Sequence, residues 1–359
     1  PGVCLQGPSG RSDQDAAAAH SDAGEPTLKI LIHPPVDEEL KAQVEHTAPE
    51  ADVVMVTHDN ALEHVLDADI LFGSYTNEMI ATARQLKWIQ TTSAGMDGSQ
   101  IPGELKESDI VVTNASGVHA VQVAEHAFAL TIALLRGLQV AFANQARGIW
   151  QGAPMSDLYN STVGIIGFGG IGRKYAEQVQ AFQTRILALD IQTDDKPAYV
   201  ESLWGMDRLD DLLRQADIVF LACPLTPETD KLICQRTLGL MKKTAFLVNT
   251  ARGGIVNEAD LVQGLRNGDI AGAGLDVFET EPLPADSPLW KLDNVILTTH
   301  AAGSSPKRHH RTVGFFCHNL RKYLAGEPLV NEIDKNRGYP AADRRDPQSF
   351  RQEISASRR

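Results

Sequence analysis

The sequence has little cysteine, no long apolar run and no excess of positive charge, and each absence excludes a class of protein. Four scattered cysteines in 359 residues, with no C-x-x-C pair and no metal-ligand spacing, favour a reduced cytoplasmic protein without a metal centre. No apolar run approaches the length of a membrane span, so no membrane segment is expected. A formal net charge of −13 disfavours binding to nucleic acid or to an anionic membrane.

Large apolar residues are also scarce at both ends of the chain. Residues 1–26 are rich in Gly, Ala, Ser, Asp and Pro, and we expect a disordered N-terminal extension there. No positively charged segment precedes an apolar one, so a secretory signal is not predicted. Polar residues with two Arg pairs dominate from about residue 336, and we expect a mobile tail over residues 334–359.

A glycine-rich turn between two apolar runs is the strongest pattern in the chain. Residues 163–166 form a short apolar run typical of a strand buried on both faces. In the G-x-G-x-x-G spacing that follows, Gly167 allows a tight turn, Gly169 lets a pyrophosphate approach the backbone and Gly172 lets a helix pack close to the strand. The free N–H groups of that helix would face the phosphates. The sequence therefore predicts a dinucleotide-binding domain.

The second apolar run, residues 186–189, ends at Asp190, which lies 18 residues after Gly172. An acidic residue at this place would accept hydrogen bonds from the adenosine ribose, and its charge would repel a 2′-phosphate. Because no Arg follows before Pro197, the pattern favours NAD as the cofactor. The alternative is a solvated acid at a strand end.

The rest of the chain alternates between strand and helix patterns, which predicts an α/β fold. Residues 62–72 and residues 209–220 have similar patterns, since both stretches indicate a helix, an Ala-Asp turn and a strand. Two such units suggest two domains of similar build. We also predict three helices: a long buried one over residues 122–138, one over residues 203–213, and a final one over residues 307–324 that returns to the first domain.

Three residues that follow predicted strands fit the chemistry of hydride transfer to a keto acid. Arg252, Glu281 and His300 all lie where ligands of open parallel sheets bind, beyond the carboxyl ends of strands, and Asp276 ends another such strand. A guanidinium can bind a carboxylate with two hydrogen bonds, an imidazole can exchange a proton near neutral pH, and a carboxylate can orient that imidazole. The alternatives are an Arg bound to backbone carbonyls, a solvated turn acid and a structural His.

A further turn, Ser93-Ala94-Gly95-Met96-Asp97, follows a predicted strand. Its backbone N–H groups could form an anion-binding nest, or the turn could be an ordinary strand end.

Together these pieces resemble the D-isomer-specific 2-hydroxyacid dehydrogenase family over residues 28–333. The resemblance rests on the order and spacing of these motifs: Ser93-Ala-Gly95-Met-Asp97, Val123-Ala-Glu125-His126, Gly167-x-Gly169-x-x-Gly172, Pro224-Leu-Thr226, Asn249-Thr-Ala-Arg252-Gly253, Leu275-Asp276-Val277-Phe278, Glu281-Pro282-Leu283 and His300-Ala-Ala-Gly303.

The family resemblance implies two Rossmann-like domains around a cleft. Residues 27–120 and 302–333 would form a flavodoxin-like substrate-binding domain, and residues 121–301 an NAD-binding domain with a doubly wound parallel sheet. It also implies a homodimer formed through the cofactor domain, involving the helix of residues 122–138.

The resemblance further implies roles for individual residues. Arg252, Glu281 and His300 would form a catalytic triad, and Asp276 would face the carboxamide of the cofactor. The substrate would contact Ser93, Ala94, Gly95, Arg252 and His300. The cofactor would contact Gly167, Gly169, Gly170, Ile171, Gly172, Asp190, Cys223, Pro224, Thr250, Ala251, Asp276 and Gly303.

Departures from other branches of the family narrow the expected substrate. Phosphite dehydrogenases carry Lys where this chain has Ala94, and formate dehydrogenases carry Gln where it has Glu281. The 59 residues after His300 leave no room for the regulatory domain that serine-biosynthesis members often carry. We therefore expect an NAD-dependent D-2-hydroxyacid dehydrogenase or 2-keto-acid reductase for glyoxylate, hydroxypyruvate or a similar small acid, with His300 as general acid and base.

Two alternatives remain open for the function. One is an NADP-preferring glyoxylate/hydroxypyruvate reductase, in which Thr193 or Lys196 would meet the 2′-phosphate. The other is a non-catalytic NAD(H)-sensing interaction module.

Overall fold

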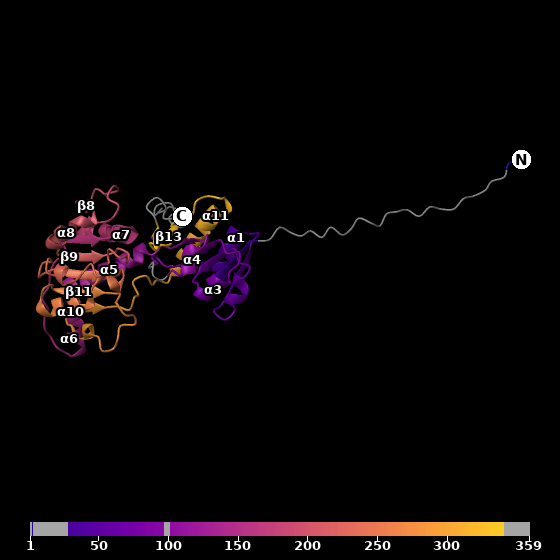
Figure 1. The fold of residues 1–359 in the computed structure, drawn as a ribbon. Coiled ribbons are helices and arrows are strands. Elements are labelled where there is room, and N and C mark those ends of the chain that lie inside the picture. The colour runs from indigo at the N-terminus through magenta and orange to yellow at the C-terminus, as the bar shows by residue number, and fades with distance from the viewer. Residues whose placement is uncertain (1, 3–27, 97–100, 341–359) are drawn as a thin grey trace.

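The computed structural model describes residues 28–96 and 101–340, together with Gly2, and shows two lobes, each built on a parallel sheet (Figure 1). The smaller sheet has the strand order β2-β1-β3-β4-β5 and the larger one β12-β11-β10-β9-β6-β7-β8. All the strand pairs in both sheets are parallel. The α/β fold class predicted from the sequence is confirmed.

The smaller sheet is built from the first part of the chain. Its strands are β1 (Lys29–His33), β2 (Asp52–Met55), β3 (Ile70–Gly73), β4 (Trp88–Gln90) and β5 (Val111–Thr113). The helices between them are α1 (Glu38–Thr47), α2 (Ala61–Val65), α3 (Asn77–Thr82) and α4 (Gly103–Glu107). Short apolar runs such as Ile30-Leu31-Ile32 are fully buried, as expected for strands covered on both faces.

The last long helix, α11 (Arg308–Leu324), also packs on the smaller sheet. The ring of its Phe316 stacks on Phe72 of β3 with centroids 4.6 Å apart, and Val313 and Leu320 belong to the same buried cluster. The predicted return of this helix to the first domain is confirmed.

The larger sheet is built from the middle of the chain. Its strands are β6 (Thr162–Ile166), β7 (Arg185–Leu189), β8 (Ser202–Trp204), β9 (Ile218–Leu221), β10 (Phe246–Asn249), β11 (Gly272–Leu275) and β12 (Val295–Leu297). Its helices are α5 (Ala120–Leu135), α6 (Leu138–Ala146), α7 (Gly170–Val179), α8 (Leu209–Gln215), α9 (Gln235–Leu238) and α10 (Glu258–Asn267).

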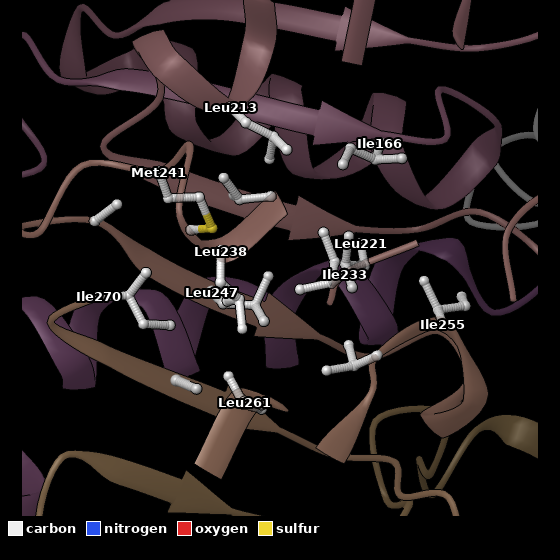
Figure 2. Packing of buried hydrophobic residues seen from close by; sticks show 14 of the residues in the cluster. Ile166, Leu213, Leu221, Ile233, Leu238, Met241, Leu247, Ile255, Leu261 and Ile270 are labelled. Atoms are coloured by element: carbon white, nitrogen blue, oxygen red, sulfur yellow. The ribbon is translucent and has the colours of Figure 1, made fainter. Parts of the chain in front are cut away.

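Two separate buried clusters cover the two faces of the larger sheet. Leu213, Leu238 and Leu261, from α8, α9 and α10, pack together against one face (Figure 2). Residues of α5 and α7, such as Leu130 and Tyr175, pack against the other face. Helices on both faces make the sheet doubly wound, and the strand order reverses between β6 and β9, where such sheets bind ligands.

The predicted helix over residues 122–138 is wrong at its C-terminal end. Helix α5 ends at Leu135, and α6 begins at Leu138 after a bend of 71°. The break lies at Gly137, whose φ of 60° suits a residue without a side chain, and whose hypothetical Cβ would lie 2.8 Å from Ala153. Among the described residues, no single helix is long and apolar enough to cross a membrane, although this bent pair passes a length and composition test.

Two further expectations differ from the structure. Residues 202–204 form the edge strand β8 instead of the start of a helix, because Leu203 and Trp204 pair with β7 and the extended Gly205 separates them from α8. The mobile tail was expected to begin at residue 334, yet Ile333–Asp334 (β13) and Tyr339–Pro340 (β14) form an antiparallel hairpin. The remaining tail residues and residues 1–26, apart from Gly2, lie outside the described chain.

Candidate active site

The predicted site residues lie along one edge of the larger sheet, because all its strands are parallel and end on the same side. His300 follows β12, Asp276 follows β11 and Arg252 follows β10. Gly167 follows β6 and Asp190 follows β7, on the other side of the reversal in strand order. The glycine loop thus lies between a group of candidate catalytic residues and the candidate ribose-binding acid, which suits an extended dinucleotide.

Glycine is needed for a different structural reason at each of the three positions of the G-x-G-x-x-G motif. Gly167 has a φ of 94°, and a Cβ there would lie 2.4 Å from the Cys223 nitrogen. A Cβ on Gly172 would lie 2.2 Å from the Gly167 carbonyl oxygen, so α7 could not pack as closely. A Cβ on Gly169 would meet nothing within 4 Å, so the space above it is open. This open space, next to the N-terminus of α7, fits a pyrophosphate.

The carboxylate of Asp190 is held by the backbone of two loops. Oδ2 accepts from the Phe168 N–H at 2.6 Å, and Oδ1 accepts from the Gln192 N–H at 3.0 Å. The half-buried acid therefore stays beside the glycine loop, with its charge at the strand end. Of the two residues considered for a 2′-phosphate, Thr193 is exposed and Lys196 donates to the Val200 carbonyl at 2.7 Å.

His300 and Glu281 form a hydrogen-bonded pair at the carboxyl edge. Nδ1 of His300 lies 2.7 Å from Oε2 of Glu281, and Oε1 of Glu281 accepts from the Phe278 N–H at 3.0 Å. Because the carboxylate is an acceptor, the imidazole carries a proton on Nδ1, and its Nε2 is left for other chemistry. About half of the His300 side-chain surface is exposed (49%).

The backbone of His300 is held in an unusual conformation. Its φ is 51°, which few residues other than glycine adopt, and its N–H donates to the Asp276 carbonyl at 2.7 Å. The Asp276 carboxylate accepts from the N–H groups of Ala301 and Ala302 at 2.8 and 2.9 Å. Asp276 thus fixes the turn that presents the imidazole, which is a reason to keep an acid at this fully buried position.

Two residues that the sequence did not mark for a role complete this network. The Thr298 hydroxyl donates to Asp276 at 2.6 Å and lies 2.9 Å from Nε2 of His126, on α5. Since the hydroxyl hydrogen is given to the carboxylate, Nε2 of His126 must donate to the Thr298 oxygen. Thr298 could have been identified from the sequence as a hydroxyl residue at a strand end, two positions before His300. His126 lies within a motif of the family but is far from His300 in the sequence.

Arg252 reaches from the larger sheet to the smaller one. Its Nη1 donates to the Ala251 carbonyl at 2.7 Å and its Nη2 to the Gly95 carbonyl at 3.2 Å. The buried Asn249 side chain holds the turn by donating to the Arg252 carbonyl and accepting from the Ala251 N–H, both at 3.0 Å. The guanidinium therefore lies against the turn that the sequence marked as a candidate anion site.

The next residue, Gly253, presses this turn against the loop that carries Glu281. A Cβ on Gly253 would lie 1.9 Å from the carbonyl carbon of Phe278, which leaves no room for any side chain. The candidate carboxylate clamp and the candidate acid–base pair are thus joined by direct backbone packing.

The turn at residues 93–95 has backbone donors without an acceptor among the described residues. Within residues 28–96 and 101–340, the N–H groups of Ser93, Ala94 and Gly95 have no hydrogen-bond acceptor, although the Ser93 carbonyl accepts from the Ala115 N–H at 2.7 Å. Free N–H groups beside a guanidinium favour an anion. Asp97, the last residue of the motif, lies outside the described residues.

The other candidate cofactor residues lie at the carboxyl edge of the larger sheet and differ in how exposed they are. The Thr250 hydroxyl is buried and has no hydrogen-bond partner among the described residues, which suits a polar ligand group. Burial raises the pKa of the Cys223 thiol to about 12, so this residue is a neutral, apolar surface. Ala251 is buried, Pro224 is exposed, and Gly170, Ile171 and Gly303 are half-buried.

Comparisons with known proteins agree with this geometry. The family model described as D-isomer specific 2-hydroxyacid dehydrogenase, NAD binding domain, matches residues 128–302. The chain is 38% identical over 287 residues to a glyoxylate reductase of Korarchaeum cryptofilum, covering 76% of this chain and 85% of that protein. It is 33% identical over 313 residues to a D-3-phosphoglycerate dehydrogenase of Methanocaldococcus jannaschii, covering 86% of this chain but 59% of that longer protein.

A solved structure shows the same arrangement of both sheets. The D-isomer specific 2-hydroxyacid dehydrogenase from Xanthobacter autotrophicus, in complex with NADPH and MES, superimposes with a TM-score of 0.75 at 27% identity. The match covers 88% of this chain and 100% of the other.

Proposed function

Because this chain belongs to the D-isomer-specific 2-hydroxyacid dehydrogenase family, a family of oxidoreductases, we propose that it interconverts a small 2-keto acid and the D-2-hydroxy acid with NAD as cofactor. The observation that carries the proposal is the His300–Glu281 pair at 2.7 Å, on the same sheet edge as Arg252 and the glycine loop. A general acid, a carboxylate clamp and a dinucleotide site are the three parts that the reaction needs.

His300 and Glu281 have different roles in the proton transfer. Nε2 of His300 gives a proton to the oxygen on C2 when a keto acid is reduced, and takes it back in the opposite direction. Glu281 holds the imidazole through Nδ1 and stabilises the positive charge that the ring carries before the proton leaves. Arg252 and the N–H groups of residues 93–95 bind the substrate carboxylate and place C2 beside His300.

The cofactor is held by the carboxyl edge of the larger sheet, an NAD(P)-binding domain. The pyrophosphate would lie over Gly169 at the N-terminus of α7, and the adenosine ribose beside Asp190. Thr250, with its unused buried hydroxyl, and Asp276 belong to the nicotinamide end. Bound there, the nicotinamide would supply a hydride to C2 of a keto acid or accept one from a hydroxy acid.

The choice of NAD over NADP rests on the charges around the ribose site. The Asp190 carboxylate would repel a 2′-phosphate, and the Lys196 ammonium is engaged with a backbone carbonyl. The Xanthobacter relative is solved with NADPH, so an NADP-preferring reductase is the competing outcome. Glyoxylate and hydroxypyruvate are the first substrates to test, since two glyoxylate reductases are 38% identical to this chain.

We further propose a cytoplasmic homodimer that binds neither nucleic acid nor membrane. Large apolar side chains are exposed on and after α6, including Phe142 at 64%, Met155 at 58% and the fully exposed Trp150. A second copy of the chain covering these residues would remove this apolar surface from water. Light scattering measures the oligomeric state, and the Trp150→Ser variant should shift the equilibrium toward the monomer.

The proposed activity is tested by oxidation of NADH and NADPH with purified protein over 2-keto acids from glyoxylate to phenylpyruvate. We expect turnover with NADH and a small acid, lost in the His300→Ala variant. Turnover with NADPH at least as efficient as with NADH would support the NADP-linked reductase instead. NADH binding without turnover of any acid would support a sensing module and contradict the proposed activity.

A further inference from the structure

Three side chains and one backbone carbonyl form a directed hydrogen-bond chain at the junction of the two sheets. Nε2 of His119 lies 3.0 Å from the Thr92 carbonyl, and its Nδ1 lies 2.9 Å from Nε2 of Gln122. Nη1 of Arg311 donates to Oε1 of Gln122 at 2.5 Å. His119 is 4% exposed and Gln122 is 6% exposed, so water competes little for these bonds.

The direction of every bond in this chain is fixed by Arg311. A guanidinium can only donate, so the oxygen of the Gln122 amide must face it and the amide N–H group must face His119. Nδ1 of His119 is therefore an acceptor, and the proton of the neutral ring is on Nε2, where it meets the Thr92 carbonyl. A proton added to Nδ1 would place two donors against each other, and rotating the amide would place its NH₂ group against Arg311.

The direction of the Thr92 carbonyl affects the turn of residues 93–95. A peptide group is planar, so fixing this carbonyl also fixes the Ser93 N–H on the opposite edge of the same plane. That N–H is the first of the three donors at residues 93–95 that have no acceptor within residues 28–96 and 101–340, and Gly95 lies against the Arg252 guanidinium. The His119 imidazole thus contributes to the direction in which the Ser93 N–H points.

We propose that His119 is a positioning residue for the substrate: it orients the turn of residues 92–95 and so sets the affinity for the 2-keto acid carboxylate. This role rests on the proposed function, since it assumes that the turn binds that carboxylate. The chain of bonds also links the turn to both connections between the sheets, since Gln122 lies in the first turn of α5 and Arg311 in the first turn of α11. His119 therefore transmits the relative placement of the two sheets to the substrate-binding turn.

Three variants separate the hydrogen bonds from the bulk of the ring. His119→Gln keeps a donor for Thr92 and an acceptor for Gln122, whereas His119→Phe fills the space and removes both. His310→Phe is the control, because His310 is exposed on the same helix as Arg311 and lies outside the chain of bonds. For each protein, kcat and KM for the keto acid are measured at saturating NADH, together with the Kd of NADH.

We expect His119→Phe to raise the KM for the keto acid about tenfold, with kcat and the Kd of NADH within about threefold of the original protein. His119→Gln and His310→Phe should keep the original KM. An unchanged KM in His119→Phe, with or without a fall in kcat, would contradict a role of the ring in binding the keto acid. Equal defects in the Phe and Gln variants would show that keeping the two hydrogen bonds does not preserve substrate binding, which overturns the proposal.

A second measurement does not depend on turnover. The Ala115 N–H donates to the Ser93 carbonyl, so its hydrogen exchange reports whether the turn is held. Exchange in this segment should be faster in His119→Phe and unchanged in His119→Gln and His310→Phe. If the original protein reduces no keto acid, the proposed function fails, yet this exchange experiment still decides whether His119 orients the turn.

Discussion

Glu281 joins two loops that follow neighbouring strands: one carboxylate oxygen lies 2.7 Å from Nδ1 of His300, and the other accepts from the Phe278 N–H within its own loop at 3.0 Å. A carboxylate held at both oxygens has little freedom to rotate. It therefore fixes the tautomer of the imidazole as well as its direction.

Replacing His300 and Glu281 one at a time should distinguish the residue that transfers the proton from the residue that orients it. His300→Ala should lower kcat by about a hundredfold or more, because general acid catalysis contributes about 10²–10⁴. Glu281→Gln keeps an oxygen for Nδ1–H but loses the charge, so we expect a smaller loss of about ten- to a hundredfold. Both variants should bind NADH as the original does, by fluorescence titration. Full activity in His300→Ala would remove the imidazole from the mechanism.

The glycines of the cofactor loop should respond differently to the same change. Gly172→Ala places a Cβ 2.2 Å from the Gly167 oxygen, so we expect a loss of about 1–3 kcal/mol in the free energy of unfolding. Gly169→Ala meets no neighbouring atom, so stability should stay within about 0.5 kcal/mol while the Kd of NADH rises. Urea unfolding and NADH titration measure the two quantities. Unaltered NADH binding in Gly169→Ala would contradict placement of the pyrophosphate over this residue.

The charge of Asp190 should control the choice between the two cofactors. Asp190→Ala removes the carboxylate beside the ribose site, so the ratio of kcat/KM for NADH to that for NADPH should fall at least about tenfold. Asp194→Ala changes an exposed acid four residues away and serves as the control. If both variants shift the ratio equally, the general negative potential and not Asp190 sets the preference.

The stability of the protein should depend on pH through His119. Burial, together with the charges of Arg308 and Arg311, lowers the pKa of His119 from the ordinary value of 6.5. Below that value the unfolded chain binds a proton that the folded protein does not, so the stabilising contribution, fully present above pH 6.5, is lost as the pH falls toward the folded-state pKa. Urea unfolding between pH 8 and 5 should show a smaller decline for His119→Gln. Identical declines in the two proteins would contradict a neutral buried imidazole.

The two cysteines of the larger lobe with opposite pKa shifts should differ in reactivity. Burial raises the pKa of Cys223 to about 12. At Cys234, partial burial acts in the same direction but hydrogen bonds from Thr237 and Arg236 outweigh it and lower the pKa. Iodoacetamide at neutral pH should therefore label Cys234 before Cys223, and NADH oxidation should survive this first labelling. Mass spectrometry reads out the order; early labelling of Cys223 would show that the cofactor edge opens to solvent.

The sequence was informative where one pattern determines one position. The buried strands are continuous apolar runs, and parallel strands all end at one edge, so the sequence alone predicts that Arg252, Asp276 and His300 lie at the edge of the larger sheet. The glycine loop could be predicted because Gly167 and Gly172 leave no room for a side chain and Gly169 leaves space open for a ligand.

Features that depend on distant partners were not predictable in this way. The bend at Gly137 depends on how closely Ala153 approaches, and the edge strand β8 exists because β7 offers it hydrogen-bonding partners. The bond between Arg311 and Gln122 joins residues 189 positions apart, and that between Arg252 and Gly95 joins residues 157 apart. Neither pair has a spacing that a periodic pattern could reveal.

The candidate proton donor, its carboxylate partner and the glycine loop all belong to the larger sheet, whereas the turn of residues 93–95 follows a strand of the smaller one. In the proposed function, the smaller sheet therefore supplies part of the carboxylate-binding surface, and the larger sheet supplies Arg252, the proton donor and the cofactor site. In evolutionary terms, a change in the smaller sheet leaves the proposed proton donor and cofactor site on the larger sheet in place. A scaffold divided in this way can acquire new substrates by gene duplication and drift while its chemistry remains under constant selection.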